Sequence, residues 1–490
     1  DYVKQEQGIK SIEYIKSANN CLTAYKQLGE ISKARKLATE VIAICKEILG
    51  NDAELLGTLY FNTSILENSQ NNMLLAAEYL NKSLDIHLNR FRKNFYTLSE
   101  KEKLNWWQEQ TYQFALSPSL LIQFPNHTPE MVNAITNQQL QLKGFVLNDA
   151  SAALRKARAS GNKALNKLID EWQSSRTLLS KQLALPIADR FYKTDSLEKI
   201  ANNFEKNINQ QASGIININQ QNTITWQTVQ ASLKDDEAAV EFIQFPFYRN
   251  SDYTDTIQYA AIVIRKNQTP QFVKLGTEKQ ISWCLTGAKE NNKQIKINSL
   301  YRSSLKGGNS NETFAGDSLY TIIWKPLMPY LQNISTVSYS PDGLLHKVAF
   351  HALPVEKDKL IIDIYRLQQY TSIRQITEKS TTAPKWNSVY LMGNADFNSL
   401  SNTTSTQGVN VTFNNTVATD SWASLPGTEK EINTLQSLFI SKKISVITTS
   451  GTKATEEKFK SLNNASPSII HLATHGFFLP DPAIKKTTNT

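Results

Sequence analysis

The chain has 490 residues, of which 40% are hydrophobic and 20% are charged, and this length and composition suit a globular protein of two or three domains. Its longest purely apolar run, residues 259–264, is far shorter than the about 20 residues that a membrane-spanning helix needs. We therefore predict no membrane partner.

The basic balance of the chain, a net charge of +9, is mild for its length. Nucleic-acid-binding proteins usually gather such charge on one face or stripe. The densest basic stretch, residues 155–167, has a helical pattern, in which interspersed charges usually face water; a groove for an acidic protein surface is the alternative. We predict that nucleic acid is contacted only indirectly, if at all.

Cysteine is sparse, with Cys21, Cys45 and Cys284 far apart in the sequence. No C-x-x-C pair occurs, so the zinc-ribbon and thioredoxin-like patterns are absent. Free thiols in this small number favour a reducing cytoplasm, which is the predicted location. We expect all three cysteines to pack as small hydrophobic residues on helices.

The first residue is Asp1 rather than Met, so we expect further sequence upstream.

Residues 1–95 have apolar positions at helical spacing and repeat at a shift of 42 residues. Ala34 matches Ala76, and Ile42 matches Leu84. A period near 40 is typical of stacked helical hairpins, each of which needs a neighbour to cover its apolar face. An irregular helical bundle is the alternative.

Residues 96–212 continue as longer helices without the repeat and are predicted to be a helical extension and connector. Gly161 and Asn162 indicate a turn between two of these helices. The stretch 207–222 is rich in Asn and Gln, which places a domain boundary there.

From about residue 222 to residue 490, short β-branched runs alternate with amphipathic helices, which predicts a third domain with a mostly parallel sheet. The whole chain is thus expected to be α + α/β. Two polar stretches, 292–317 and 398–420, are expected to be long surface loops. The candidate strands are 238–245, 257–264, 336–339, 388–393, 444–449 and 468–474, and the candidate helices are 278–291, 318–331, 428–439 and 454–462.

The segment with the clearest chemical content ends at His475 and Gly476. Thr428 and Glu431 have the spacing of a helix capping box, and residues 468–474 read as a strand buried on both faces. An imidazole at the carboxyl end of a parallel strand lies where α/β sheets place their sites. The glycine beside it permits a close approach of a substrate backbone.

The other histidines are expected to have other roles. His471 and His475 are four residues apart, which on a strand is about 13 Å and too far to share a metal ion. We therefore predict no metal and no cofactor, and we expect His471 to be a hydrogen-bonded core residue. His346 and His351 are expected to have surface or structural roles.

Several motifs of the chain, in order, resemble those of the CHAT domain, a caspase-related protease domain commonly fused to tetratricopeptide repeats. Residues 1–95 resemble such repeats, and the likeness covers nearly the whole chain. The residues that carry it are Leu98–Glu102, Lys143–Gly144, Trp226–Val229, Val240–Phe242, Ser340–Leu345, Phe350–Pro354, Leu425–Glu431 and His471–Gly476.

The resemblance implies a caspase-like sheet and a Cys–His dyad that cleaves a protein substrate. His475 would be the dyad histidine, and the backbone N–H of Gly476 would stabilise the oxyanion. The repeats would bind a protein partner or a sensor complex, as in bacterial immunity, including CRISPR-associated systems. Caspases carry an arginine where this chain has Leu425, so cleavage after aspartate is not expected.

The nucleophile that the resemblance implies would follow on the next strand, yet no cysteine lies between His475 and Thr490. Three explanations stay open: the remainder lies outside this chain, the loop 479–490 is cut and a separate fragment supplies the cysteine, or the protein is a pseudo-protease or non-catalytic scaffold. Cys284 is a poor substitute, because it lies within an expected helix. We expect this chain alone to be inactive.

Overall fold

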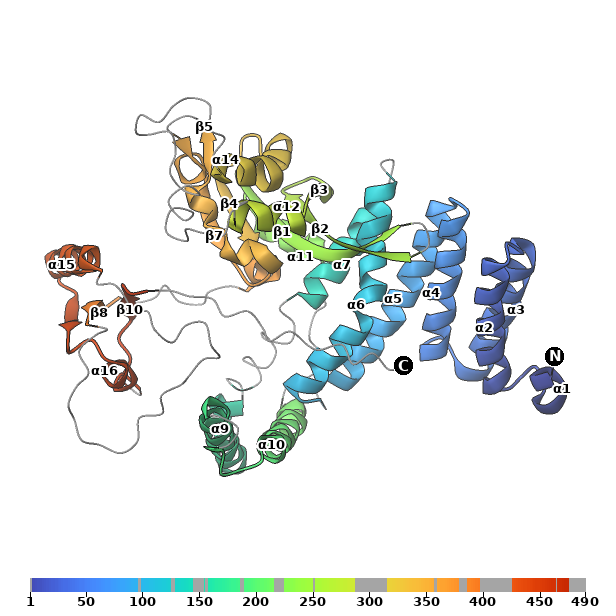
Figure 1. Ribbon diagram of the computed structural model, residues 1–490, viewed down its shortest axis with the longest axis horizontal. Helices are drawn as coiled ribbons and strands as arrows, with labels where there is room; N and C mark the ends of the chain where they lie inside the picture. The colour runs from blue at the N-terminus through green and yellow to red at the C-terminus, as the bar shows by residue number, and fades with distance from the viewer. Residues whose placement is uncertain are drawn as a thin grey trace. The chain divides into compact units, whose positions relative to one another are not determined.

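The computed structural model of the protein is shown in Figure 1. Two compact units are distinguished: Asp1–Leu179 with Lys193–Lys379, and Ser180–Tyr192 with Ser380–Thr490. The structure describes all residues except 1, 96–97, 125–127, 144–153, 155–156, 186–188, 216–223, 250–251, 287–314, 357–358, 379–385, 397–424, 464 and 476–490.

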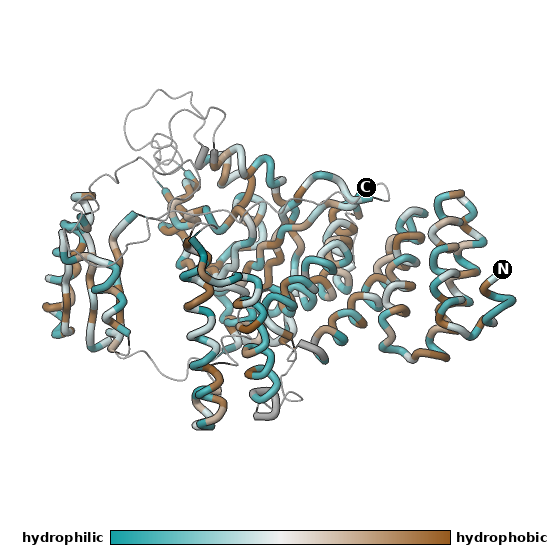
Figure 2. The backbone as a smooth tube through the Cα atoms, turned by 60° about the horizontal axis from the view of Figure 1, so that its bottom comes forward, coloured by the Kyte–Doolittle hydropathy of each residue, from teal (hydrophilic) through white to brown (hydrophobic). Residues whose placement is uncertain are grey.

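The N-terminal helices pack as successive hairpins. The Ser11 side chain accepts a hydrogen bond from the Tyr14 N–H and so caps the second helix, and Gly50, with a φ of 80°, ends the third. Ala34 and Ala76, which the sequence repeat pairs, are fully buried on the second helix of each hairpin. These helices are α1 (Tyr2–Gln7), α2 (Ile12–Gln27), α3 (Ile31–Leu49), α4 (Glu54–Ser69) and α5 (Met73–Phe95), on which polar and apolar residues alternate in Figure 2.

Longer helices follow, with capping residues that explain their starts. Ser99 and Glu102 form a capping box at the beginning of the first of them. The predicted turn at Gly161 and Asn162 is confirmed: Gly161 has a φ of 68°, and the Asn162 side chain accepts a hydrogen bond from the Leu165 N–H. The helices are α6 (Glu100–Gln123), α7 (Pro129–Leu142), α9 (Lys163–Ala184) and α10 (Thr194–Ile215).

A five-stranded sheet with the order β3-β2-β1-β4-β7 forms the core of the first unit. β1 pairs antiparallel with β2 and parallel with β4, and β4 pairs parallel with β7. The strands are β1 (Glu237–Arg249), β2 (Asp252–Arg265), β3 (Gln271–Thr277), β4 (Thr336–Ser340) and β7 (Arg366–Gln369).

Both faces of this sheet are covered. Val240 and Phe242 face a cluster that includes Trp324, whereas Ala239 and Ile243 face a cluster with helices α7 and α11 (Trp226–Ser232). The remaining short elements are α12 (Glu278–Thr286), α14 (Ala315–Leu319), η3 (Tyr320–Trp324), η4 (Lys325–Tyr330), η5 (Gly343–Lys347), η6 (Phe350–Ala352), β5 (Pro354–Glu356), β6 (Lys359–Leu360), η7 (Ile361–Asp363) and η8 (Ile373–Thr377).

The second unit contains a parallel three-stranded sheet with the order β10-β8-β9. Its strands are β8 (Ser388–Ala395), β9 (Ser445–Gly451) and β10 (Ile469–Leu472), and its helices are α15 (Pro426–Ser441) and α16 (Glu456–Lys460). Helix α15 covers one face, where Ile432 packs against Val389 and Leu391. Figure 1 shows α15 beside β8 and β10.

The predicted α + α/β fold class is confirmed, and each of the six candidate strands has its counterpart. The expected helix 318–331 is corrected, because that stretch changes from α to π to 3-10 geometry through α14, η3 and η4. Pro326 and Pro329 lack the N–H groups that a regular helix would need there. The predicted domain boundaries stay predictions.

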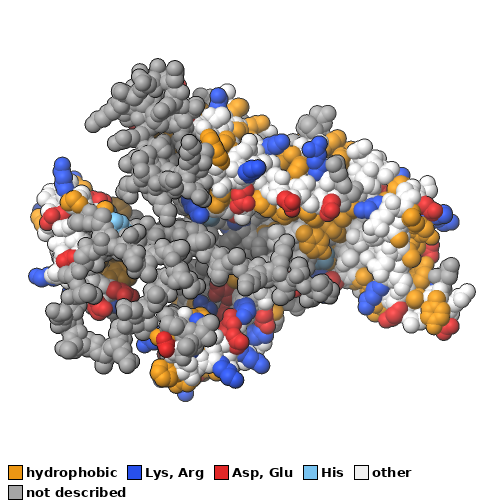
Figure 3. Space-filling model, in the orientation of Figure 1, with side chains coloured by type: hydrophobic (Ala, Val, Ile, Leu, Met, Phe, Trp, Pro, Cys, Tyr) orange, Lys and Arg blue, Asp and Glu red, His pale blue; other side chains and the backbone are white. Residues whose placement is uncertain are grey.

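No helix in the described ranges has the length and apolarity to cross a membrane. In Figure 3, basic and acidic side chains are interspersed over the coloured part of the face shown. Most of the predicted loop 292–317 and all of the loop 398–420 lie outside the described residues.

Candidate active site

Strand β10 determines where His475 lies. It pairs in parallel with β8 from Ile469, opposite Val389, to Leu472, opposite Met392. The Ala473 N–H donates to the Met392 carbonyl at 2.7 Å, so the pairing continues one residue beyond the strand. His475 therefore follows the carboxyl end of a parallel strand by three residues, and its side chain is half-buried. Gly476 lies outside the described residues.

His471 lies on the face of β10 that meets α15. Its Nε2 atom is 3.0 Å from Glu431 Oε1, in a direction that does not give a hydrogen bond. The side chain is 32% exposed. The expectation of a hydrogen-bonded core residue is thus wrong, because β10 is at the edge among the described strands and the His471 side chain is only partly covered.

The carboxyl end of the central strand β8 is tightly packed at Gly393. A Cβ atom there would lie 2.9 Å from Ile432 Cγ2, 3.0 Å from the Thr428 carbonyl oxygen and 3.4 Å from Ala473 Cβ. The next residue, Asn394, has a φ of 51°, the left-handed conformation. The end of β8, the first turn of α15 and the segment that leads to His475 therefore meet at one point.

Helix α15 begins earlier than the capping-box pattern predicts. Its N-cap is Leu425, and Pro426 occupies the first helical position, where the missing N–H of proline does no harm. Thr428 lies inside the helix; its hydroxyl donates to the Leu425 carbonyl at 2.6 Å and accepts from the Asn394 N–H at 2.8 Å. The predicted capping box of Thr428 and Glu431 is wrong, because this hydroxyl ties the helix to β8.

The cysteines of the chain lie on helices of the first unit. Cys284 is 3% exposed on α12, and burial raises the pKa of its thiol, the opposite of what a nucleophile needs. Cys45 is buried, and burial raises the pKa of its thiol too. Cys21 is exposed, which corrects the expectation that it packs.

The two histidines four residues apart are on a strand and its extension, and not on one helix face. Within the described residues there is no group of three His, Cys, Asp or Glu side chains suited to a metal ion. His346 and His351 are exposed in the first unit.

A buried ion pair that the sequence did not predict lies at the carboxyl end of β4, beside Glu241 in β1. Lys143 Nζ lies 2.7 Å from Glu241 Oε1 and donates to the carbonyl oxygens of Phe242, at 2.6 Å, and Ser340, at 3.0 Å. Glu241 Oε2 accepts from the Ile373 N–H at 2.9 Å. These contacts fasten Lys143, at the C-terminus of α7, to the sheet, so we assign the pair a structural role.

The adjacent turn at Asp342 and Gly343 is also structural. Asp342 accepts from the Gln244 N–H at 3.0 Å and from the Gly343 N–H at 2.9 Å. A Cβ atom on Gly343, whose φ is 50°, would lie 2.4 Å from the Tyr259 hydroxyl. Three of the sequence motifs, around residues 143, 241 and 342, thus come together here, although nearly 200 residues separate the first from the last.

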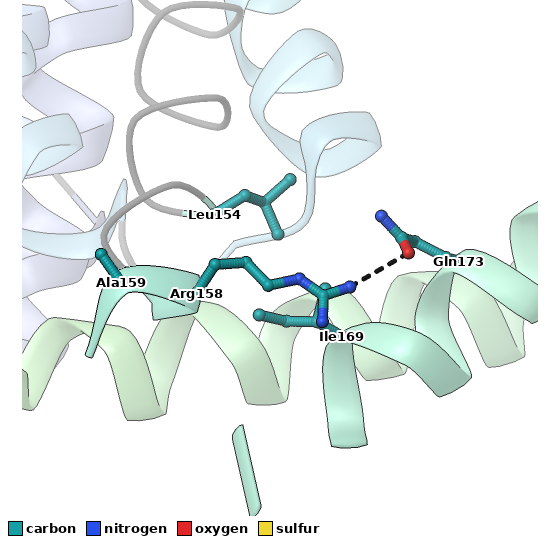
Figure 4. Close-up of a pocket in the computed structure, with 5 residues that line it drawn as sticks. All are labelled: Leu154, Arg158, Ala159, Ile169 and Gln173. Carbon is teal, nitrogen blue, oxygen red and sulfur yellow. Dashed lines mark hydrogen bonds between the residues drawn. The ribbon is translucent and has the colours of Figure 1, made fainter. Parts of the chain in front are cut away.

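His475 lines neither of two open pockets that the described residues form. One, of about 490 Å³, is drawn in Figure 4, where Arg158 reaches across it to the Gln173 side chain. Arg158 also bonds Asp170 at 2.7 Å, so its guanidinium is already engaged. The other, of about 520 Å³, lies on the outer side of α15, lined by residues that include Pro426, Glu429 and Asn433.

Residues 314–487 match the family model of the CHAT domain. The match includes β4, both edges of the three-stranded sheet and His475, and it confirms the CHAT part of the resemblance. It does not include the helical residues 1–212. A search of the curated proteins found no match to the chain.

Proposed function

We propose that this protein is a cysteine endopeptidase of the caspase-like kind, in which His475 is the histidine of a Cys–His dyad. The observation that carries the proposal is the position of this half-buried imidazole, three residues beyond a parallel strand and inside the residues that match the CHAT model. Open α/β sheets bind ligands outside the carboxyl ends of their strands. Histidine is also the side chain that most often transfers protons in catalysis.

In this proposal His475 acts on both halves of acyl transfer. It accepts the proton of a cysteine thiol, and the thiolate attacks the carbonyl carbon of the substrate peptide bond. The imidazolium then donates this proton to the leaving amine as the C–N bond breaks. Water subsequently hydrolyses the thioester. The backbone N–H of Gly476 would stabilise the oxyanion of the tetrahedral intermediate.

The free edge of β10 supports a route for the nucleophile. β10 pairs with β8 on one side, and none of the described strands pairs with its other side. An edge strand presents unpaired N–H and C=O groups to which a further strand can add. A parallel strand at that edge would bring its carboxyl end beside His475. The proposal therefore draws the cysteine from polypeptide outside these 490 residues, continuous with the chain or separate from it.

We assign partner binding to the helical hairpins of residues 1–95. Leu28, between α2 and α3, is 73% exposed, and Leu74, at the start of α5, is 59% exposed. Leu28 directly follows α2 and Leu74 lies in the first turn of α5, so each is beside the turn inside its hairpin. Exposed leucines beside these turns support a contact surface for a protein partner or sensor complex.

The proposal is tested by peptide cleavage with the protein that includes the cysteine-bearing sequence. The wild type is incubated with a library of protein substrates, and cleavage is compared with that of His475→Ala. His351→Ala is the matched control, since it removes an exposed histidine of the first unit. We expect the first substitution to abolish cleavage and the second to leave it unchanged.

Cleavage that survives His475→Ala removes this residue from the mechanism. Reading the coding sequence past residue 490, and searching for a second chain that supplies a strand ending in cysteine, tests the other half of the dyad. If neither exists, the remaining function is that of a non-catalytic scaffold, in which the helical hairpins bind a partner.

A further inference from the structure

The approach to His475 depends on how three segments meet at Gly393. The space that a side chain would need is already filled by Ile432 and the Thr428 backbone of α15 and by Ala473 of the segment after β10. Ala473 is two residues before His475. The position of α15 relative to the end of β8 therefore fixes the path of the chain that carries the imidazole.

One hydroxyl joins the helix to the strand at this junction. Thr428 Oγ1 donates to the Leu425 carbonyl and accepts from the Asn394 N–H, so both its donor and an acceptor site are used. Asn394 is in the left-handed conformation, which few residues other than glycine and asparagine adopt. The Thr428 bond is thus positioned to hold the end of β8 in this unusual geometry.

Further along the same helix, two side chains face β10. Ile432, 1% exposed, packs in one cluster with Ala473 and Val389. Glu431 lies next to His471, with 3.0 Å between its Oε1 and the imidazole Nε2. Because both side chains are partly exposed, this contact contributes little. The buried contacts and the Thr428 hydroxyl are therefore the features that fix α15 against β8 and β10.

We propose that Thr428 is a positioning residue for His475, acting through its bond to the Asn394 N–H at the junction of β8, α15 and β10. This inference rests on the proposed peptidase function for its kinetic consequence, though not for its structural one. Loss of the hydroxyl leaves the Asn394 N–H without this acceptor, and the end of β8 shifts against α15. The residues that follow Ala473 shift with it, and the imidazole no longer aligns with the nucleophile.

The test compares Thr428→Val, which keeps the shape and removes the hydroxyl, with Thr428→Ser, which keeps the hydroxyl. Thr434→Val is the matched control: it removes a hydroxyl from the same helix that bonds only the Lys430 carbonyl one turn earlier. In the protein with its cysteine, we expect Thr428→Val to lower kcat about 10- to 100-fold with KM nearly unchanged, since small misplacements have effects of this size. Thr428→Ser and Thr434→Val retain wild-type rates.

A second readout uses the 490-residue chain itself and needs no activity. Hydrogen exchange of the Asn394 amide is expected to be at least tenfold faster in Thr428→Val than in the wild type, and the imidazole NMR signals of His475 are expected to shift. Neither change is expected in Thr428→Ser or Thr434→Val. If the valine variant does not fold, Thr428→Ala replaces it in the same comparison.

The outcomes separate the two proposals. One outcome is that the wild type cleaves nothing, while the Asn394 exchange and the His475 signals respond to Thr428→Val as expected. The peptidase function is then wrong, and the positioning role of Thr428 is supported. If Thr428→Val matches the wild type in exchange and in the His475 signals, or if Thr428→Ser behaves like Thr428→Val, the positioning role is overturned.

Discussion

The two sheets of the protein are covered to very different depths. In the five-stranded sheet, Ile262 and Val240 are fully buried, because helices pack on both faces. In the three-stranded sheet, Ile447, Ile470 and Leu472 are 52%, 40% and 44% exposed on the face opposite α15. Among the described residues, the first sheet is enclosed on both faces, whereas in the second nothing pairs with the outer edge of β10, the edge that the proposed chemistry needs.

The largest effect on stability is expected at Lys143 in the first unit. Lys143→Met leaves the Glu241 carboxylate, 1% exposed, without its cation, which typically costs about 3–5 kcal/mol of the free energy of unfolding. The measurement is chemical denaturation of the purified chain. Lys101→Met is the control, because it removes an exposed ion pair with Glu198 and should cost less than about 1 kcal/mol. Equal losses in the two variants would show that the buried pair has no special role.

Two isoleucines on strands compare the sheets directly. Ile262→Ala in β2 is expected to cost about 2–5 kcal/mol, since the side chain is fully enclosed and its removal leaves a cavity. Ile447→Ala in β9 is expected to cost less than about 1 kcal/mol, because half of that side chain already contacts water. Denaturation followed by a probe in each unit gives both values. A loss at Ile447 as large as that at Ile262 would mean that the open face is covered in solution.

Within the second unit, Gly393 and Gly427 form a contrasting pair. Gly393→Ala forces a Cβ atom to within 2.9 Å of Ile432, and we expect a loss of about 1–3 kcal/mol from overpacking. Gly427→Ala meets nothing within 4 Å in the first turn of α15 and is expected to be neutral or slightly stabilising. Thermal unfolding of the two variants measures the difference. If Gly393→Ala is also neutral, the junction beside His475 is looser than described.

The smallest expected effect is a pH dependence in the helical hairpins. Burial lowers the pKa of His87, with Glu54 acting in the opposite direction and Arg90 in the same direction. As pH falls below 6.5, the ordinary pKa of histidine, His87 is therefore protonated in the unfolded chain at a higher pH than in the folded chain. The contribution of His87 to the free energy of unfolding is fully present above about pH 6.5. It falls as pH drops from there toward the lower pKa of the folded state, by at most about 1.4 kcal/mol per pH unit.

This pH dependence is measured as the difference between wild type and His87→Gln in denaturation midpoints from pH 8 to pH 5. Burial raises the pKa of Glu205, so that carboxyl contributes a dependence of the opposite sign, which the difference removes. His351→Gln, at an exposed position, is the control. Parallel curves for wild type and His87→Gln would contradict the account.

The secondary-structure elements that the sequence predicted correctly are those that depend on local periodicity. The strands β1, β2, β4, β8, β9 and β10 are all at candidate positions, because β-branched runs bounded by turn residues are a strong local signal. β7 was not predicted, since Arg366–Gln369 is a polar edge strand with little apolar pattern. The start of α15 was misplaced because Pro426, a favourable first helical residue, outweighed the capping pattern at Thr428.

In the candidate site, too, the features that follow from local sequence were predicted, and those that depend on long-range contacts were not. The position of His475 at the end of a parallel strand follows from the apolar run before it, and the sequence predicted it. The pairing of Lys143 with Glu241 could not be predicted, because the two residues are 98 positions apart and a lone lysine at a helix end usually faces solvent. The bond from Asn394 to Thr428 was missed for the same reason: only the fold brings the ends of β8 and α15 together.

The central claim, that His475 works with a thiolate, is tested most directly by alkylation kinetics of the catalytic cysteine. Iodoacetamide is added to the protein with its cysteine-bearing sequence, and the modified residue is followed by mass spectrometry in wild type and in His475→Ala. We expect rapid modification near neutral pH in the wild type and a fall to the rate of an ordinary thiol in the variant. Equal rates in the two proteins would contradict it.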